Sequence, residues 1–155
     1  MRLGTRARYA VMAMVDLGCQ CNGRPVSLAE IAERQEISLC YLEQLFAKLR
    51  RAGLVNSVRG PGGGYRLAHD REDIRIGDII RAVDEPIRAV RCSSGAIGCR
   101  GDRSRCLTHD LWEELSNQIH LYLSSVSLGD VCQKRVLGTS GLLQREAYRT
   151  AVAAK

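Results

Sequence analysis

Three cysteines and one histidine lie within eighteen residues, in the pattern Cys92-x6-Cys99-x6-Cys106-x2-His109. The residues between the cysteines are small or polar, with Ile97 as the one large apolar side chain. A segment with so little to bury does not order itself by packing. Thiolates and an imidazole can bind a metal ion or an iron–sulfur cluster, and such a centre would supply the missing stabilisation.

Other interpretations of this cysteine loop are weaker. The chain has seven cysteines, an odd number, and no recognisable signal peptide. Both features predict a reducing, cytoplasmic compartment, in which disulfides are rare. Incidental cysteines would not be spaced evenly and followed by Cys-x2-His. The choice between zinc and an iron–sulfur cluster stays open, although zinc ligands usually come in closer pairs and the wide spacing favours a centre with two metal atoms.

Positive charge is concentrated in the first half of the chain. The net charge is +6, and residues 1–68 contain ten Lys or Arg against five Asp or Glu. This excess predicts a polyanionic partner such as double-stranded DNA. No apolar run is long enough to span a bilayer, so neither a membrane span nor a membrane partner is expected.

The same half of the chain predicts a helix-turn-helix. Apolar residues recur at helical spacing over residues 4–20. Ser27 and Glu30 have the spacing of a capping box that opens a short second helix. After a short break, Ser38 is expected to cap a third helix that ends at Gly53. A pair of short helices joined by a few residues is typical of the DNA-binding motif.

Polar side chains on the third helix favour contact with DNA, because they can bond to base edges or phosphates in a major groove. The expected contacts on this helix are Ser38, Cys40, Tyr41, Glu43, Gln44 and Lys48. Arg2 and Arg8 lie near the start of the first helix, where a cation opposes the helix dipole. Contact with DNA phosphates would explain these two arginines.

A glycine-rich hairpin follows the third helix. Short apolar segments flank Gly60-Pro-Gly-Gly-Gly64, which predicts two strands joined by a tight tip. A hairpin in this place is a wing, and glycines let a backbone approach its partner closely. Arg59, Gly60 and Pro61 at the tip are therefore expected to contact a DNA minor groove.

These motifs together resemble a known family. Ile37-Ser-Leu-Cys-Tyr-Leu-Glu-Gln-Leu-Phe and Ser57-Val-Arg-Gly-Pro-Gly-Gly-Gly-Tyr resemble the winged-helix family of the iron–sulfur cluster regulator IscR, as does the loop ending in Cys106-Leu-Thr-His109-Asp-Leu-Trp. The resemblance covers roughly residues 1–131. It implies a 2Fe-2S cluster held by Cys92, Cys99, Cys106 and His109, and DNA contacts by Tyr41, Glu43, Gln44 and Arg59. Two departures are that Cys40 replaces an expected small hydroxyl residue and that each interval in the loop is about one residue longer.

The second half of the chain predicts two further helices. Residues 76–84 form a short amphipathic pattern that should pack on the winged domain and end at Pro86. A longer apolar stripe begins at Leu107 and has more apolar surface than a small domain can cover. The same helix of a second copy is the expected cover, and the alternative is an intramolecular core helix. The expected dimerisation residues are Leu111, Leu115, Ile119, Tyr122, Leu123 and Val126.

The predicted fold class is mainly α with a small β-hairpin wing. Residues 1–85 would form a winged helix-turn-helix DNA-binding domain and 86–109 a cluster-binding loop. Residues 107–132 would form the dimerisation helix and a short following helix, and 133–155 a flexible tail. The cysteines outside the loop and two further histidines are expected to be structural or incidental: Cys19, Cys21, Cys40, Cys132, His69 and His120.

The predicted function is that of a homodimeric, cluster-sensing transcription regulator that binds a palindromic promoter site. The resemblance adds that it mainly represses genes for cluster assembly, with the cluster supplied by assembly proteins. The alternatives are a nitric oxide- or iron-responsive regulator of the same family, a zinc-stabilised winged-helix protein, and a cluster carrier without a DNA role. The wing and the basic first half disfavour the carrier. An enzyme is not expected, because the sequence has no Ser/His/Asp set, phosphate loop or paired carboxylates.

Overall fold

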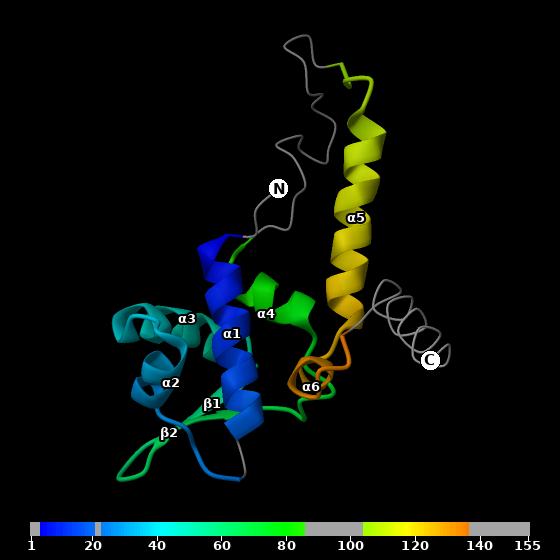
Figure 1. The fold of residues 1–155 in the computed structure, drawn as a ribbon. Coiled ribbons are helices and arrows are strands. Elements are labelled where there is room, and N and C mark those ends of the chain that lie inside the picture. The colour runs from blue at the N-terminus through cyan, green and yellow to red at the C-terminus, as the bar shows by residue number, and fades with distance from the viewer. Residues whose placement is uncertain (1–3, 21–22, 86–103, 137–155) are drawn as a thin grey trace, which may run out of the picture.

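The computed structural model describes residues 4–20, 23–85 and 104–136. Figure 1 shows α1 in the middle of the molecule, with α2, α3 and the hairpin on one side and α5 extending on the other. The elements in chain order are α1 (Thr5–Gln20), α2 (Leu28–Gln35), α3 (Leu39–Arg51), β1 (Val55–Val58), β2 (Gly64–Leu67), α4 (Ile76–Ala82), α5 (His109–Ser125) and α6 (Leu128–Cys132). The predicted fold class, mainly helical with a small hairpin, is confirmed.

Helix α1 is the centre of the hydrophobic core. Its small side chains at Ala7, Ala10 and Ala13 are fully buried. The larger side chains of Met14 and Leu17 are fully buried as well. The alanines let other helices approach closely, and α1 packs against α2, α3, α4 and α6. The helical spacing predicted for residues 4–20 therefore marks a helix that is covered by neighbours along most of its length.

The helix-turn-helix is formed by α2 and α3, and most of its predicted boundaries are confirmed. Ser27 and Glu30 make the capping box, with Glu30 N–H donating to Ser27 Oγ at 3.3 Å and Ser27 N–H donating to Glu30 Oε2 at 2.8 Å. The turn between the helices contains Glu36 in a left-handed conformation. Ser38 does occupy the N-cap position of α3, but its side chain makes no capping hydrogen bond. The predicted N-cap position of Ser38 is therefore confirmed, but the cap is made by its backbone carbonyl, which accepts from Leu42 N–H at 3.0 Å.

A buried carboxylate joins α1 to α2. The side chain of Asp16 is 2% exposed and accepts from Arg34 Nη2 at 2.6 Å and from Gln35 Nε2 at 2.7 Å. The guanidinium of Arg34 also donates from Nε at 3.1 Å. Because a buried carboxylate is stable only when hydrogen bonds and an opposite charge compensate it, this contact fixes the position of α2 on α1.

The hairpin is antiparallel and is anchored through Tyr65 of β2. Val55 pairs with Leu67 and Val58 with Gly64. Val26, which precedes α2, exchanges two backbone hydrogen bonds with Tyr65, at 3.0 and 2.8 Å. The ring of Tyr65 packs edge-on against buried Phe46 of α3, with 4.9 Å between ring centroids. The wing is thus held by the same core that holds α3.

Helix α4 ends earlier than predicted. It ends at Ala82, and Asp84 then adopts a left-handed conformation with φ of 56°. The change of direction therefore precedes Pro86, and the prediction that this proline ends the helix is wrong. Gly77 of α4 is buried against α5, where a Cβ atom would lie 2.7 Å from Ser124 Oγ. The close crossing of α4 and α5 depends on this glycine.

The short helix predicted after α5 is confirmed, and it is part of the core of the winged domain. Ser127 and Asp130 form a capping box at the start of α6, and Leu128 is fully buried. Backbone hydrogen bonds join this segment to residues 74–76, including Leu128 N–H to the Ile74 carbonyl at 2.8 Å. The first residues of the predicted tail are also bound, because Arg135 pairs with Glu72 at 3.0 Å. Residues 137–155 lie outside the described residues.

Candidate DNA-binding surface and metal site

One face of α3 is covered by the core and the opposite face is open. Leu42, Leu45, Phe46 and Leu49 are buried. The predicted DNA contacts at Ser38, Cys40, Glu43 and Gln44 are all exposed. The structure therefore presents these four side chains together along the outer face of the helix, as a helix that enters a major groove requires.

Tyr41 lies at the edge of this open face. Its ring is half-buried and packs edge-on against Tyr9 of α1, with centroids 6.0 Å apart and planes at 85°. This contact fixes the direction of the phenol ring. A hydroxyl on a ring that is held in place loses less conformational freedom when it binds a partner than one on a free side chain.

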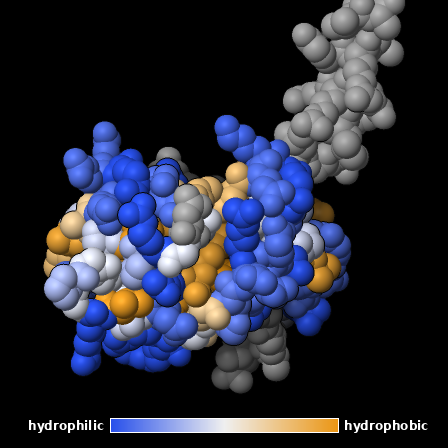
Figure 2. All heavy atoms as spheres, turned by 90° about the horizontal axis from the view of Figure 1, so that it is seen from below, coloured by the Kyte–Doolittle hydropathy of each residue, from blue (hydrophilic) through white to orange (hydrophobic). Residues whose placement is uncertain are grey.

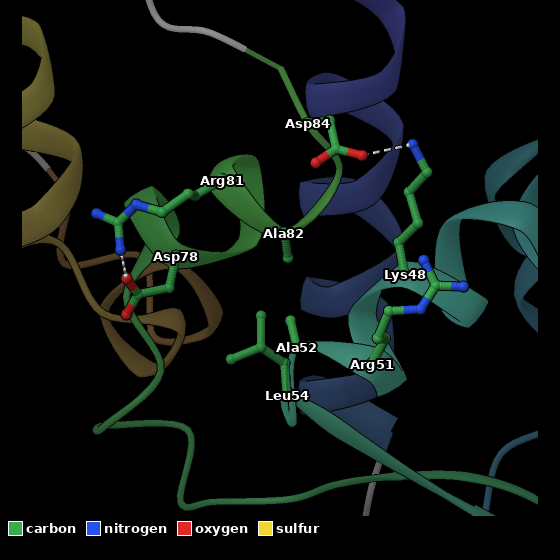
Figure 3. Close-up of a pocket in the computed structure, with 8 residues that line it drawn as sticks. All are labelled: Lys48, Arg51, Ala52, Leu54, Asp78, Arg81, Ala82 and Asp84. Atoms are coloured by element: carbon green, nitrogen blue, oxygen red, sulfur yellow. Dashed lines mark hydrogen bonds and ion pairs between the residues drawn. The ribbon is translucent and has the colours of Figure 1, made fainter.

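Lys48 is placed differently from the other predicted contacts. Its Nζ donates to Asp84 Oδ2 at 3.0 Å, across a groove between the end of α3 and α4 (Figure 3). The groove has a volume of about 540 Å³, and its apolar lining is formed by Ala52, Leu54 and Ala82. The hydrogen bond from Lys48 lowers the pKa of Asp84 below its usual value. Lys48 thus links α3 to the end of α4.

The hairpin tip exposes the predicted minor-groove residues Arg59, Gly60 and Pro61. The glycines of the tip have structural reasons of their own. Gly60 and Gly62 have φ of 103° and 71°, and a Cβ on Gly63 would lie 2.5 Å from the Val58 carbonyl oxygen. The turn itself therefore requires several glycines, and the glycine run alone does not indicate close approach to DNA.

The side of the molecule that carries the hairpin is mostly hydrophilic. Seen from below in Figure 2, hydrophilic residues cover most of this face and apolar residues appear in small groups. Arg8 is exposed on α1, while Arg2 lies outside the described residues. Within the described part of the chain, no helix is long and apolar enough to cross a membrane.

Two of the four predicted metal ligands lie in the described residues. His109 is the first residue of α5 and is 3% exposed. The backbone N–H of His109 donates to the backbone carbonyl of Cys106 at 3.0 Å, so a single turn brings the two residues together. Cys106 lies before the start of α5. A helical Cys106 would share a face with His109, but Cys106 is not helical and does not. Cys92 and Cys99 lie outside the described residues.

The turn between these two residues is held from the helix side. Trp112 Nε1 donates to Thr108 Oγ1 at 3.1 Å, and the same hydroxyl lies 3.8 Å from Cys106 Sγ. The indole therefore fastens the turn to the first turn of α5. A thiol and an imidazole that are presented on a braced turn need little reorganisation to bind a common centre.

A second group of possible ligands surrounds His109. Ligand atoms of His109, Asp110 and Glu113 lie within 4.8 Å of one another, and Glu113 Oε2 is 3.8 Å from His109 Nε2. Sequence reasoning missed this group, although the spacing of four residues from His109 to Glu113 could have revealed it. Asp110 also pairs with Arg105 at 3.2 Å, so one of the two carboxylates already has a cation.

Five of the six predicted dimerisation residues divide into two sets, and the sixth, Ile119, is intermediate in exposure. Leu111, Leu115 and Tyr122 are exposed, at 61%, 38% and 48%. Leu123 and Val126 instead pack against the core of the same chain. The C-terminal end of α5 is thus partly covered by the same chain, whereas Leu111, Leu115 and Tyr122 leave an apolar strip exposed along the helix.

Comparison with known proteins identifies the class to which this fold and surface belong. A family model described as Rrf2, iron-dependent transcriptional regulator, matches residues 3–134. The regulator IscR of Photobacterium profundum is 54% identical over 131 residues, which cover 84% of this chain and 75% of that one. IscR of Escherichia coli O1:K1 is 51% identical over 142 residues, covering 91% and 86%.

Solved structures agree with the sequence relatives. CymR of B. subtilis, described as the global cysteine regulator, has a TM-score of 0.73 at 33% identity and covers 86% of this chain and 98% of that one. IscR of T. potens has a TM-score of 0.70 at 39% identity, covering 90% and 91%. The chain belongs to the Rrf2 family of transcriptional regulators. Within that family it is a DNA-binding transcription regulator of the IscR type, and its relatives are named as regulators and not as enzymes.

Proposed function

We propose that the protein senses iron–sulfur clusters and regulates, mainly by repression, the genes for cluster assembly. The proposed sensor is a 2Fe-2S cluster held by Cys92, Cys99, Cys106 and His109. The observation that carries the proposal is the braced turn that joins Cys106 to a buried His109 at the start of α5. This turn occurs in a chain of the IscR type.

The donor set fits a cluster on chemical grounds. Thiolates and imidazoles are the protein ligands of such centres, and an imidazole in place of a thiolate raises the reduction potential of the cluster. A neutral imidazole also brings less negative charge to the iron than a thiolate would, so it binds the iron less strongly. We therefore expect the cluster to be labile, so that the filled fraction of the protein follows the supply of clusters delivered by assembly proteins.

The open surface of α3 and the hairpin tip support binding to double-stranded DNA. Glu43 and Gln44 would read base edges in a major groove, and Arg59 would enter the adjacent minor groove. Two copies joined along the exposed strip of α5 would present two such surfaces to a palindromic site. The exposure of Leu111 and Leu115 supports this homodimer.

Helix α5 is the proposed link between the cluster and DNA. Its first residue is His109, and its far end continues into α6, which packs on α1. A change in the loop before His109 would therefore reach both the dimer contact and the winged domain through one rigid element. A coupling free energy of about 1–3 kcal/mol between the two sites would change DNA affinity roughly 5–150-fold.

The direct test combines composition with two substitutions. Protein prepared without oxygen should contain iron and acid-labile sulfide in equal amounts and be red-brown. Gln44→Ala and Arg59→Ala should keep that cluster and lose specific DNA binding, whereas Arg81→Ala on α4 should keep both. Colourless protein without sulfide would contradict the cluster. Unchanged DNA binding in both α3 and wing variants would contradict the proposed surface.

One observation favours a second candidate, which is a regulator that binds a single divalent metal ion. The group at His109, Asp110 and Glu113 contains the oxygen and nitrogen ligands that such an ion prefers. Glu113→Gln would then weaken metal binding, whereas Cys106→Ser would not. The cluster proposal predicts the opposite, with loss of iron and sulfide in Cys106→Ser and retention of both in Glu113→Gln.

A further inference from the structure

Two thiols outside the proposed cluster ligands meet where α1 packs on α6. Cys132, the last residue of α6, donates from Sγ to the Val15 carbonyl at 3.7 Å. Cys19 lies four residues after Val15, on the same face of α1, and side chains of a helix lean back toward its N-terminus. A Cβ atom on Gly18 would lie 3.3 Å from Cys132 Sγ. The sulfur of Cys132 therefore rests against the last turn of α1, beside Cys19.

The two thiols interact and differ in access. Burial, followed by the side-chain hydrogen bond with Cys19, raises the pKa of Cys132 to about 12. Cys19 is exposed, whereas Cys132 is only partly accessible. A thiol with so high a pKa reacts slowly with an oxidant in solution, since the thiolate is the reactive form. The exposed partner is the one that an oxidant reaches first.

We propose that Cys19 and Cys132 are a redox modification site that forms a reversible disulfide when the protein meets hydrogen peroxide. The site does not depend on the cluster ligands, so it goes beyond the proposed function. It would give the protein a second oxidant-responsive element, at the opposite end of α5 from His109.

The chemistry balances with peroxide as the only oxidant. The Cys19 thiolate attacks one peroxide oxygen, the O–O bond breaks, and hydroxide leaves to be protonated to water. Cys19 is then a sulfenic acid. The sulfur of Cys132 attacks that of Cys19, the S–O bond breaks, and a second water leaves with the proton of Cys132. Two electrons pass from the two sulfurs to the peroxide, and a dithiol reductant reverses the change.

The disulfide would join two segments that now meet only through packing and hydrogen bonds. It closes a covalent link between α1, the centre of the core, and α6, which anchors the base of α5. Its formation would hold α6 in place, and the link constrains the unfolded chain strongly because its ends are far apart in the sequence.

The test uses the full chain with Cys92, Cys99 and Cys106 changed to Ser, alongside the wild-type protein, so that cluster ligands do not contribute thiols. Each is treated with hydrogen peroxide, the remaining thiols are blocked, and disulfide-linked peptides are identified by mass spectrometry. Cys21 is close to Cys19 in the sequence, so Cys21→Ser is included, and Cys40→Ser serves as the control for an isolated exposed thiol. The expected result is a Cys19–Cys132 link in all of these proteins and its absence in Cys19→Ser.

Thermal unfolding provides a second measurement. Oxidised protein should unfold about 5 °C or more above the reduced protein, and dithiothreitol should remove the difference. Cys19→Ser and Cys132→Ser should show no such shift while folding normally when reduced. A Cys19 that is oxidised to sulfinic acid without a link to Cys132 would overturn the proposal. A link from Cys132 to Cys21 instead would also overturn it.

Discussion

The winged domain and helix α5 use their apolar residues in opposite ways. In the winged domain, apolar positions at helical spacing are covered by the same chain, and Phe46 and Leu49 are fully buried. In α5, the same spacing leaves Leu111 and Leu115 exposed, whereas Leu123 near its C-terminal end packs against the core of the described chain. A periodic apolar pattern therefore predicts a helix in both regions, but it does not predict which molecule covers that helix.

The largest loss of stability should follow from a substitution in the core of the winged domain. Phe46→Ala removes a fully buried ring that also contacts Tyr65 of the wing, so it should lower the free energy of unfolding by about 3–5 kcal/mol. Phe46→Leu, which leaves a smaller cavity, should cost less. Urea unfolding followed by circular dichroism measures both. If both variants lost little stability, and the same amount, the core would not be what holds the wing in place.

Two leucines on α5 form a matched pair for testing the dimer interface. Leu111 and Leu121 are exposed to nearly the same extent, at 61% and 60%, but Leu121 lies about a quarter turn away from Leu111. Leu111→Glu should weaken the dimer by about 2 kcal/mol or more, roughly 30-fold in its dissociation constant. Leu121→Glu should leave the dimer intact. Analytical ultracentrifugation measures both, and equal effects would contradict the proposed interface.

A change at the metal site tests why a histidine is used there. His109→Cys would supply a fourth thiolate and should hold the cluster more tightly, by about 1 kcal/mol or more. The loss of cluster absorbance in the presence of a chelator should then be several-fold slower than in the wild-type protein. A variant that lost its cluster as fast as the wild type would remove the argument that lability comes from the imidazole.

The smallest effects on stability are expected at two serines that begin helices, Ser38 and Ser127, and they should differ between the two. Ser127 accepts from Asp130 N–H at 3.0 Å, so Ser127→Ala should cost about 1 kcal/mol of stability. The side chain of Ser38 makes no capping bond, so Ser38→Ala should change stability by less than about 0.5 kcal/mol while weakening DNA binding. Thermal unfolding and a DNA-binding titration test the pair. If Ser38→Ala and Ser127→Ala lost the same stability, the conclusion that only the Ser127 side chain caps its helix would be contradicted.

The pH dependence of the Ser127 effect has a definite sign. Hydrogen bonds from Ser127 lower the pKa of Asp130 below the ordinary value of 3.8. A carboxyl group whose pKa is lowered by folding contributes stability above that ordinary value and loses it as the pH falls through the folded value. The difference between Ser127→Ala and the wild-type protein should therefore shrink below about pH 4.

Local patterns in the sequence predicted the local structure. The capping box at Ser27 and the short helix after α5 each depend on residues a few positions apart, and both are confirmed. Contacts between distant residues could not be predicted in this way. Lys48 pairs with Asp84, and Leu123 packs on the core, because of how α3, α4 and α5 meet in space.

The candidate site shows the same division. The exposed face of α3 followed from its helical period, and the proximity of Cys106 to His109 followed from their spacing. The glycines of the wing predict close approach to DNA, but backbone geometry at Gly60, Gly62 and Gly63 accounts for them. The carboxylate of Glu113 lies beside His109, and the cysteine spacing does not predict it, because Glu113 falls outside the Cys-x2-His pattern.

We propose that the centre at the start of α5 controls how the paired winged domains bind DNA. The most direct measurement is the affinity of one anaerobic preparation for its promoter DNA, before and after removal of the cluster, at a fixed salt concentration. The filled and empty forms should differ in DNA affinity by roughly 5–150-fold. Equal affinities would contradict this proposal.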